Sequence, residues 1–75
     1  MTVKIIGSNT INGIKLKRII LKIANSIDGK ITINLIDDLS HNDLPILYIN
    51  NNLISKGLVL NEKELIKHFK NNIKD

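Results

Sequence analysis

The sequence predicts a single α/β domain whose elements follow the order β-α-β and then β-β-α, with one short segment between the halves. Three observations predict this class. Short β-branched runs stand at residues 2–6, 30–36 and 46–49, two longer runs have the apolar spacing of amphipathic helices, and turn-forming residues separate them. The chain has 75 residues, 16 of them Ile, so residues 1–75 are expected to bury one aliphatic core.

The first strand and the first helix have the clearest patterns. Within residues 2–6, Val3 and Ile5 share one face, and Gly7 ends the run. A helix is expected over residues 12–26, before a turn signal at residues 28–29. Its apolar stripe follows the 3.6-residue period and consists of Leu16, Ile19, Ile20, Ile23 and Ile27.

Residues 30–36 alternate between apolar and polar side chains, which is typical of a strand with one buried face. Strand, helix and strand in this order imply two parallel strands joined by a right-handed crossover. Residues 37–44 are polar and hold one helical turn at most. The apolar set expected to face the helices is Ile31, Ile33 and Leu35, and the polar set is Lys30, Thr32 and Asn34.

A hairpin follows the polar segment. Pro45 opens the apolar strand 46–49, and the first position of a strand is one where proline is tolerated. Asparagines at residues 50–52 favour a turn, because asparagine accepts a positive φ. Residues 53–60 are expected to return as the partner strand, with Gly57 at a bulge or a close backbone approach.

The last element is a helix that begins after Asn61. Asn61 is a good N-cap residue, and Glu64 follows three positions later, as in a capping box. The helix carries an apolar stripe that consists of Leu65, Ile66, Phe69 and Ile73.

Composition excludes several classes of function. The chain has no cysteine, so it holds no disulfide framework, no thiolate nucleophile and no cysteine-based metal centre. No apolar run reaches the roughly 18 residues of a membrane span, and the first residues show no signal-peptide pattern. We therefore expect a cytoplasmic protein without a membrane partner. A net charge of +4 is mild and requires no anionic partner.

The order of elements resembles that of the small thioredoxin-like and glutaredoxin-like proteins of bacteria and archaea, over nearly the whole chain. Residues 10–13, Thr-Ile-Asn-Gly, stand where that family has Cys-x-x-Cys, and Leu44-Pro45 stands where it has Thr-Pro. The resemblance implies a thioredoxin-like fold with a four-stranded mixed sheet and a reduced middle helix. It also implies a cis proline whose preceding residue offers backbone groups to a peptide or to glutathione. The candidate binding residues are therefore Thr10, Ile11, Asn12, Gly13, Leu44 and Pro45.

Thr10 stands in the place of the family's first cysteine. A helix N-terminus stabilises a thiolate, but the pKa of a hydroxyl is far too high for the same dipole to ionise it. Thiol–disulfide catalysis is thus excluded, and we expect Thr10 to cap the helix, with Asn9 and Asn12 as rival caps. The alternative is an anion or peptide contact at the free N–H groups of the first turn.

The interpretation that follows is a degenerate active site and a non-catalytic module that binds a protein or peptide, with no cofactor. One alternative is a glutathione-binding or small-thiol-binding relative of the oxidoreductases. A second is weak nucleic-acid binding through the basic first helix, but the chain lacks stacking aromatics, so a solvated helix face is favoured. His41 and His68 fit no metal motif. The basic residues in question are Lys15, Lys17, Arg18 and Lys22.

A reduced middle segment has a structural consequence. Two helices then cover only one face of the sheet, and the other face keeps apolar positions such as Ile6, Ile36 and part of 46–49. We expect this open face to contact a partner or a second copy of the chain, as a homodimer.

Overall fold

The structure is a computed structural model that describes residues 1–27 and 30–73. Six elements follow one another along the chain, and four of them form one sheet with strand order β2-β1-β3-β4. Strand β1 pairs in parallel with β2 and antiparallel with β3, and β3 pairs antiparallel with β4. The elements are β1 (Thr2–Ile6), α1 (Ile11–Ser26), β2 (Thr32–Ile36), β3 (Ile46–Ile49), β4 (Asn52–Lys56) and α2 (Glu62–Ile73).

The expected α/β class, the four-stranded mixed sheet and the two helices are confirmed. Most element boundaries agree with the sequence prediction to within two residues. The exception is the hairpin strand, which was expected over 53–60 but ends at Lys56. It ends there because Gly57 adopts a φ of +71° and turns the chain, while its N–H donates to the Pro45 carbonyl at 2.8 Å. The turn expected at residues 28–29 lies outside the described residues.

The pairing of β3 with β4 contains an irregularity. The register shifts between Leu47 and Tyr48, so that Leu47 lies opposite Ser55 and Tyr48 opposite Leu53. The extra residue on β4 is Ile54, which packs against the core instead of following the alternation. The bulge therefore lies within the strand pair, and Gly57 shows the other expected alternative, a close approach to the backbone of Asp43.

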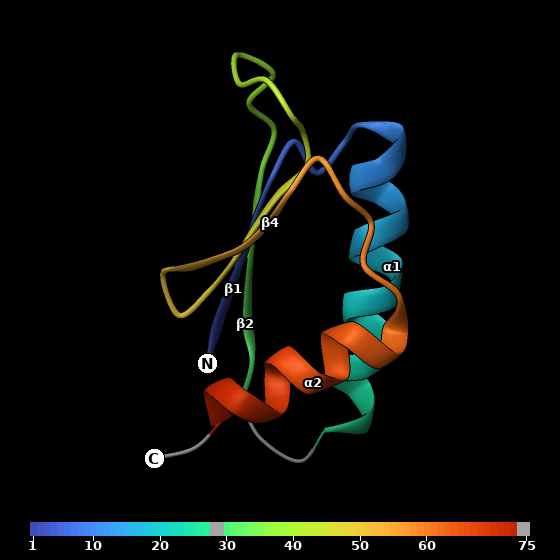
Figure 1. The fold of residues 1–75 in the computed structure, drawn as a ribbon, viewed down its shortest axis with the longest axis vertical. Coiled ribbons are helices and arrows are strands. Elements are labelled where there is room, and N and C mark those ends of the chain that lie inside the picture. The colour runs from blue at the N-terminus through green and yellow to red at the C-terminus, as the bar shows by residue number, and fades with distance from the viewer. Residues whose placement is uncertain (28–29, 74–75) are drawn as a thin grey trace.

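Both helices lie on the same face of the sheet, and α2 crosses the lower part of α1 (Figure 1). The segment between β2 and β3 forms no helix at residues 37–45, which agrees with the expectation of one helical turn at most. In Figure 1 this segment is a loop that extends past the ends of the strands. Within it, the Asp38 carboxylate accepts hydrogen bonds from the Ser40 N–H at 2.9 Å and hydroxyl at 2.6 Å.

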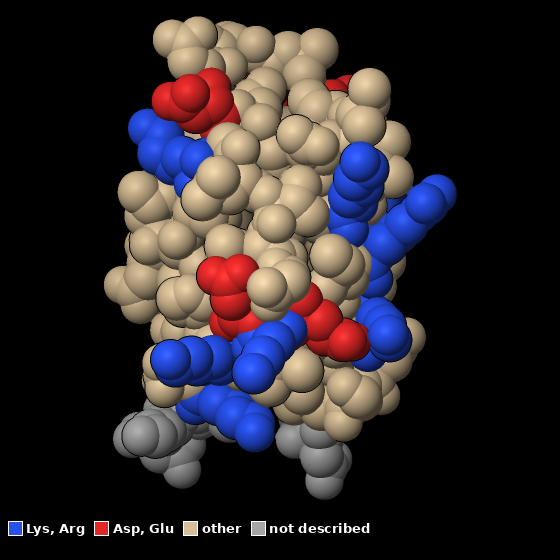
Figure 2. All heavy atoms as spheres, turned by 45° about the vertical axis from the view of Figure 1, so that its right-hand side comes forward, with Lys and Arg blue, Asp and Glu red and all other residues tan. Residues whose placement is uncertain are grey.

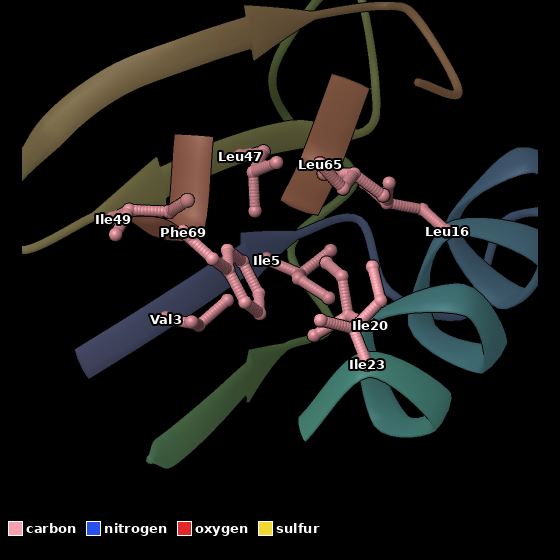
Figure 3. Packing of buried hydrophobic residues seen from close by; sticks show 9 residues of the cluster. All are labelled: Val3, Ile5, Leu16, Ile20, Ile23, Leu47, Ile49, Leu65 and Phe69. Atoms are coloured by element: carbon pink, nitrogen blue, oxygen red, sulfur yellow. The ribbon is translucent and has the colours of Figure 1, made fainter. Parts of the chain in front are cut away.

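The core lies between the sheet and the two helices. Figure 3 shows the Phe69 ring pointing between Val3 and Ile5 of β1, with the α1 side chains on the far side. Nine side chains form this cluster, and none exceeds 1% exposure. Because each buried aliphatic or aromatic side chain contributes about 1.5–3 kcal/mol, this layer dominates the stability of the domain. The cluster consists of Val3, Ile5, Leu16, Ile20, Ile23, Leu47, Ile49, Leu65 and Phe69.

Neither of the two helices in the described part of the chain covers the opposite face of the sheet (Figure 1). Its centre is the cross-strand pair Lys4 and Tyr48, with the ammonium 4.7 Å from the ring centroid. Ile36 at its edge is 37% exposed, but Ile46, which pairs with Ile6 on this face, is only 4% exposed. The open face therefore keeps exposed apolar surface at Ile36 and at Leu53, which pairs with Tyr48 and is 53% exposed, but little at Ile46.

Candidate binding site at the amino end of the first helix

The site is built on the turn that joins β1 to α1. Gly7 adopts a φ of +78°, a conformation that side chains rarely allow, and this reverses the chain directly after the strand. The N–H of Gly7 donates to the carbonyl of Ile36 at 2.8 Å, so the turn begins against the end of β2. Its own carbonyl points back toward the helix, where it accepts the Thr10 N–H at 3.2 Å.

Thr10 is the N-cap of α1. Its hydroxyl accepts the N–H of Gly13 at 3.0 Å and donates to the carbonyl of Gly7 at 2.7 Å. The expected capping role is confirmed, and neither Asn9 nor Asn12 takes that role. Because the hydroxyl is already both donor and acceptor inside the turn, Thr10 contributes geometry to the site and no free reactive group.

Gly13 is the point where helix and turn touch. A Cβ built on Gly13 would lie 2.8 Å from the Thr10 hydroxyl and 2.9 Å from the Ser8 carbonyl carbon, and closer still to the Gly7 carbonyl oxygen. Gly13 and Ser8 are both buried. A glycine at this position is thus required for the turn to fold against the first helical turn.

The second candidate segment lies against the same turn. The Leu44–Pro45 peptide bond is cis. The side chain of Leu44 lies over Gly7, since a Cβ on Gly7 would be 2.9 Å from both the Leu44 Cβ and one of its methyl carbons. The structure therefore brings the two candidate segments, 10–13 and 44–45, together on either side of Gly7.

The predicted site residues differ in how far a ligand could reach them. Ile11 is 77% exposed, Asn12 is exposed and Leu44 is half-buried, whereas Gly13 and Pro45 are buried. Among the described residues, neither the N–H nor the C=O of Leu44 makes a hydrogen bond. The site therefore offers an exposed apolar side chain at the start of α1 and, on the other side of Gly7, a half-buried residue whose backbone groups are unbonded among the described residues.

Sequence reasoning missed two residues that shape this site. The sequence pattern indicates Gly7 only as the end of a strand, yet in the structure Gly7 lies between both segments and contacts Leu44. Asp43 has a φ of 57°, and its Cα lies 3.5 Å from the position of a Cβ on Gly57. A glycine after each of β1 and β4 was the available signal, because glycine marks close backbone approaches as well as turns.

The neighbouring loop holds a small polar cluster. The imidazole Nε2 of His41 lies 3.3 Å from the Asp38 carboxylate. Hydrogen bonds from the Ser40 hydroxyl and N–H, together with a smaller contribution from His41, hold the pKa of Asp38 below its usual range. No group of three or more possible metal ligands occurs in the described part of the chain. His68, on α2, accepts a hydrogen bond from Asn72 through its backbone carbonyl.

On the face that Figure 2 shows, lysine and arginine side chains gather along the right side and at the lower end, and acidic side chains lie between these two groups. Lys22 of α1 forms an ion pair with Glu62 of α2 at 3.3 Å, and both side chains are largely exposed. Within the described residues, neither helix is long and apolar enough to cross a membrane.

Comparison with known proteins gives no relative for this chain: no family model matches it, and neither does any curated protein or solved structure.

Proposed function

We propose that this chain is a thioredoxin-like domain that has lost its redox nucleophiles and that binds an extended peptide segment of a protein partner. The peptide lies beside Leu44, at the amino end of α1. The observation that carries this proposal is the contact of Leu44 with Gly7, which places the unbonded Leu44 backbone against the turn that leads into α1, whose first residue, Ile11, is exposed.

The topology supports a thioredoxin-like origin. Strand order β2-β1-β3-β4, with β1 parallel to β2 and both remaining pairs antiparallel, agrees with the arrangement that the resemblance implies. The crossover helix α1 and the final helix α2 share one face of the sheet (Figure 1). The short loop at 37–45 stands where that family carries its middle helix.

The chemistry of the turn favours binding over catalysis. The chain has no cysteine, and the Thr10 hydroxyl is held between Gly7 and Gly13. What stays accessible is recognition chemistry: a free backbone N–H and C=O at Leu44, the apolar Ile11 side chain and the positive end of the α1 dipole. A partner segment in extended conformation fits these groups, since its backbone can pair with Leu44 as an added strand does.

The proposal is tested by recording amide chemical shifts of the ¹⁵N-labelled protein with two probes. The first probe is carboxymethylated α-lactalbumin, a permanently unfolded chain, and the second is reduced glutathione. Binding of the unfolded chain should shift amides at residues 7–13 and 43–46 and leave α2 unchanged. Shifts with glutathione alone would replace this function by the small-thiol alternative, and no shift with either probe at millimolar concentration would overturn it.

A matched pair of variants distinguishes binding at the proposed site from nonspecific binding to exposed apolar side chains. Ile11→Asp should weaken binding of the unfolded chain, because it places a charge where we expect the apolar contact. Leu53→Asp serves as the control, since Leu53 is also exposed, at 53%, but lies beside the hairpin turn, at the end of β3 and β4 away from Pro45. Equal weakening by both variants would mean that the probe binds exposed leucine and isoleucine side chains nonspecifically.

A further inference from the structure

Strand β2 forms one edge of the sheet and lacks the features that normally protect such an edge. The other edge, β4, has a bulge and ends at Lys56. By contrast β2, with the sequence Thr-Ile-Asn-Leu-Ile, has no charge, no proline and no shift of register against β1. Leu35 at this edge is 47% exposed, although the sequence pattern places it on the helix-covered face.

The hydrogen bonds to β1 show which backbone groups of β2 point outward. The N–H of Thr32 donates a hydrogen bond to the carbonyl of Met1 at 2.9 Å, and the carbonyl of Ile36 accepts one from the N–H of Gly7 at 2.8 Å. The backbone groups of the even-numbered residues of β2 therefore face β1. Because the N–H and C=O groups of successive residues in a strand point to opposite edges of that strand, those of Ile33 and Leu35 point away from β1 and out of the sheet. Within the described residues, these outward groups have no partner.

We propose that a second copy of this chain pairs with β2 as an antiparallel strand, giving a symmetric dimer with one continuous sheet. The two-fold axis passes beside Asn34. Ile33 then faces Leu35 of the second copy as a hydrogen-bonded pair, and the same pair recurs on the other side of the axis. The pairing covers the exposed Leu35 side chain with the half-buried Ile33 of the other copy.

Opposite charges at the two ends of β2 favour this register over the registers in which the paired strands are shifted along each other. Lys30 lies just before β2 and Asp38 two residues after it. With Asn34 at the axis, each Lys30 lies opposite an Asp38, so opposite charges meet at both ends of the paired strands. A slip that centres the axis on Ile33 or Leu35 also satisfies the outward groups, but it moves Lys30 away from Asp38.

A second copy fits this edge better than it fits the open sheet face. Face-to-face stacking would bring Lys4 against a like charge or break its contact with the Tyr48 ring. It would also gain little from Ile46, which is already 96% buried by its own chain, given its 4% exposure. The edge offers unpaired backbone groups, an exposed leucine and opposite charges at its two ends, which together make it complementary to itself.

Single-cysteine variants test the register, because the natural chain contains no cysteine. Opposed residues of a pair without hydrogen bonds lie about 4.5 Å apart at Cα, a distance that a disulfide spans. Asn34→Cys should therefore oxidise rapidly to a covalent dimer, and Ile33→Cys and Leu35→Cys should oxidise far more slowly. Faster cross-linking at position 33 or 35 would overturn the register, and faster cross-linking of a Tyr48→Cys variant would assign the contact to the open face.

Sedimentation velocity from micromolar to millimolar concentration tests the dimer itself. Leu35→Lys should weaken association at least tenfold, whereas Leu53→Lys on the opposite edge, also an exposed leucine, should leave it unchanged. Lys30→Glu should weaken it by about tenfold through like charges, and adding Asp38→Lys should restore it. A natural chain that stays monomeric throughout, or equal effects of both leucine variants, would overturn the proposal.

Discussion

Replacement of Gly13 by alanine is the sharpest test of how the turn is built. Alanine is normally the better helix residue, by about 1 kcal/mol per substitution of glycine. At this position the added methyl would lie 2.8 Å from the Thr10 hydroxyl and 2.9 Å from the Ser8 carbonyl carbon. These neighbours are backbone or a bonded cap, so the strain cannot be relieved by rotating a flexible side chain.

The expected magnitude follows from three contributions. Overpacking in a tight site costs about 1–3 kcal/mol. Displacing the Thr10 hydroxyl from the Gly13 N–H costs about 1 kcal/mol, as for loss of an N-cap. The gain in helix propensity of about 1 kcal/mol offsets the latter. The Gly13→Ala variant should therefore lose about 1–3 kcal/mol of unfolding free energy, which for a domain of this size lowers Tm by roughly 4–24 °C.

Urea unfolding followed by circular dichroism measures this change. Asn25→Ala is the matched control, because Asn25 is exposed in the same helix and alanine there gains propensity without a clash. The control should be unchanged or stabilised by about 0.5 kcal/mol. If Gly13→Ala is as stable as the natural chain or more stable, the close contact between α1 and the Gly7 turn is wrong.

Four further predictions concern single polar groups. Thr10→Val should destabilise by about 1–2 kcal/mol in urea unfolding, because it removes both hydroxyl bonds of the cap. Asn61→Ala should cost about 1 kcal/mol in the same assay, since the Asn61 side chain accepts the Glu64 N–H at 2.8 Å. Ser55→Ala should stabilise by about 0.5–1 kcal/mol, because the buried hydroxyl of Ser55 has no hydrogen-bond partner among the described residues; a destabilised variant would indicate a missed partner. Asp38 should titrate by NMR below its usual pKa, and Ser40→Ala should raise that pKa. Because the pKa of Asp38 is lower in the folded state than in the unfolded state, its carboxylate stabilises the fold fully at pH values above the unfolded-state pKa. This stabilisation is lost as the pH falls through the folded-state pKa.

The sequence predicted those parts of the fold that depend on local periodicity. The alternation over residues 2–6 and the apolar stripe from Leu16 to Ile23 each leave only one face of the element that can be buried. The type of each element and the face that it turns to the core were therefore predictable. The cap at Asn61 was predictable for the same reason, since a capping side chain bonds only within its own turn.

Features that depend on contacts between distant segments were not predictable. The end of β4 at Lys56 depends on Gly57 packing against Asp43 and bonding to Pro45, and none of these is close in sequence. The bulge at Ile54 depends on the register against β3, which an apolar pattern does not determine when both faces accept apolar residues. For the site, Thr10 was predictable as a cap, but the role of Gly7 under Leu44 was not.

The proposed peptide site and the proposed dimer edge lie at separate places on the molecule, and this separation predicts how the two surfaces affect each other. The candidate peptide site lies beyond the carboxyl end of β1, and β1 is parallel to β2, the strand proposed to form the dimer. Antiparallel pairing of the two β2 strands therefore directs the two peptide sites toward opposite ends of the continuous sheet. Neither site then contains a residue of the other copy, so each copy should bind its peptide independently.

This independence is measurable with a variant that breaks the dimer. Leu35→Lys should weaken association at least tenfold in sedimentation while leaving the affinity for the unfolded-chain probe, and the shifts at residues 7–13, unchanged. Conversely, Ile11→Asp should weaken probe binding and leave the dimer intact. If Leu35→Lys also weakens probe binding in a chain that is still folded by circular dichroism, the two surfaces are coupled. In that case the edge strand, with its free backbone groups at Ile33 and Leu35, would itself be the peptide-binding surface.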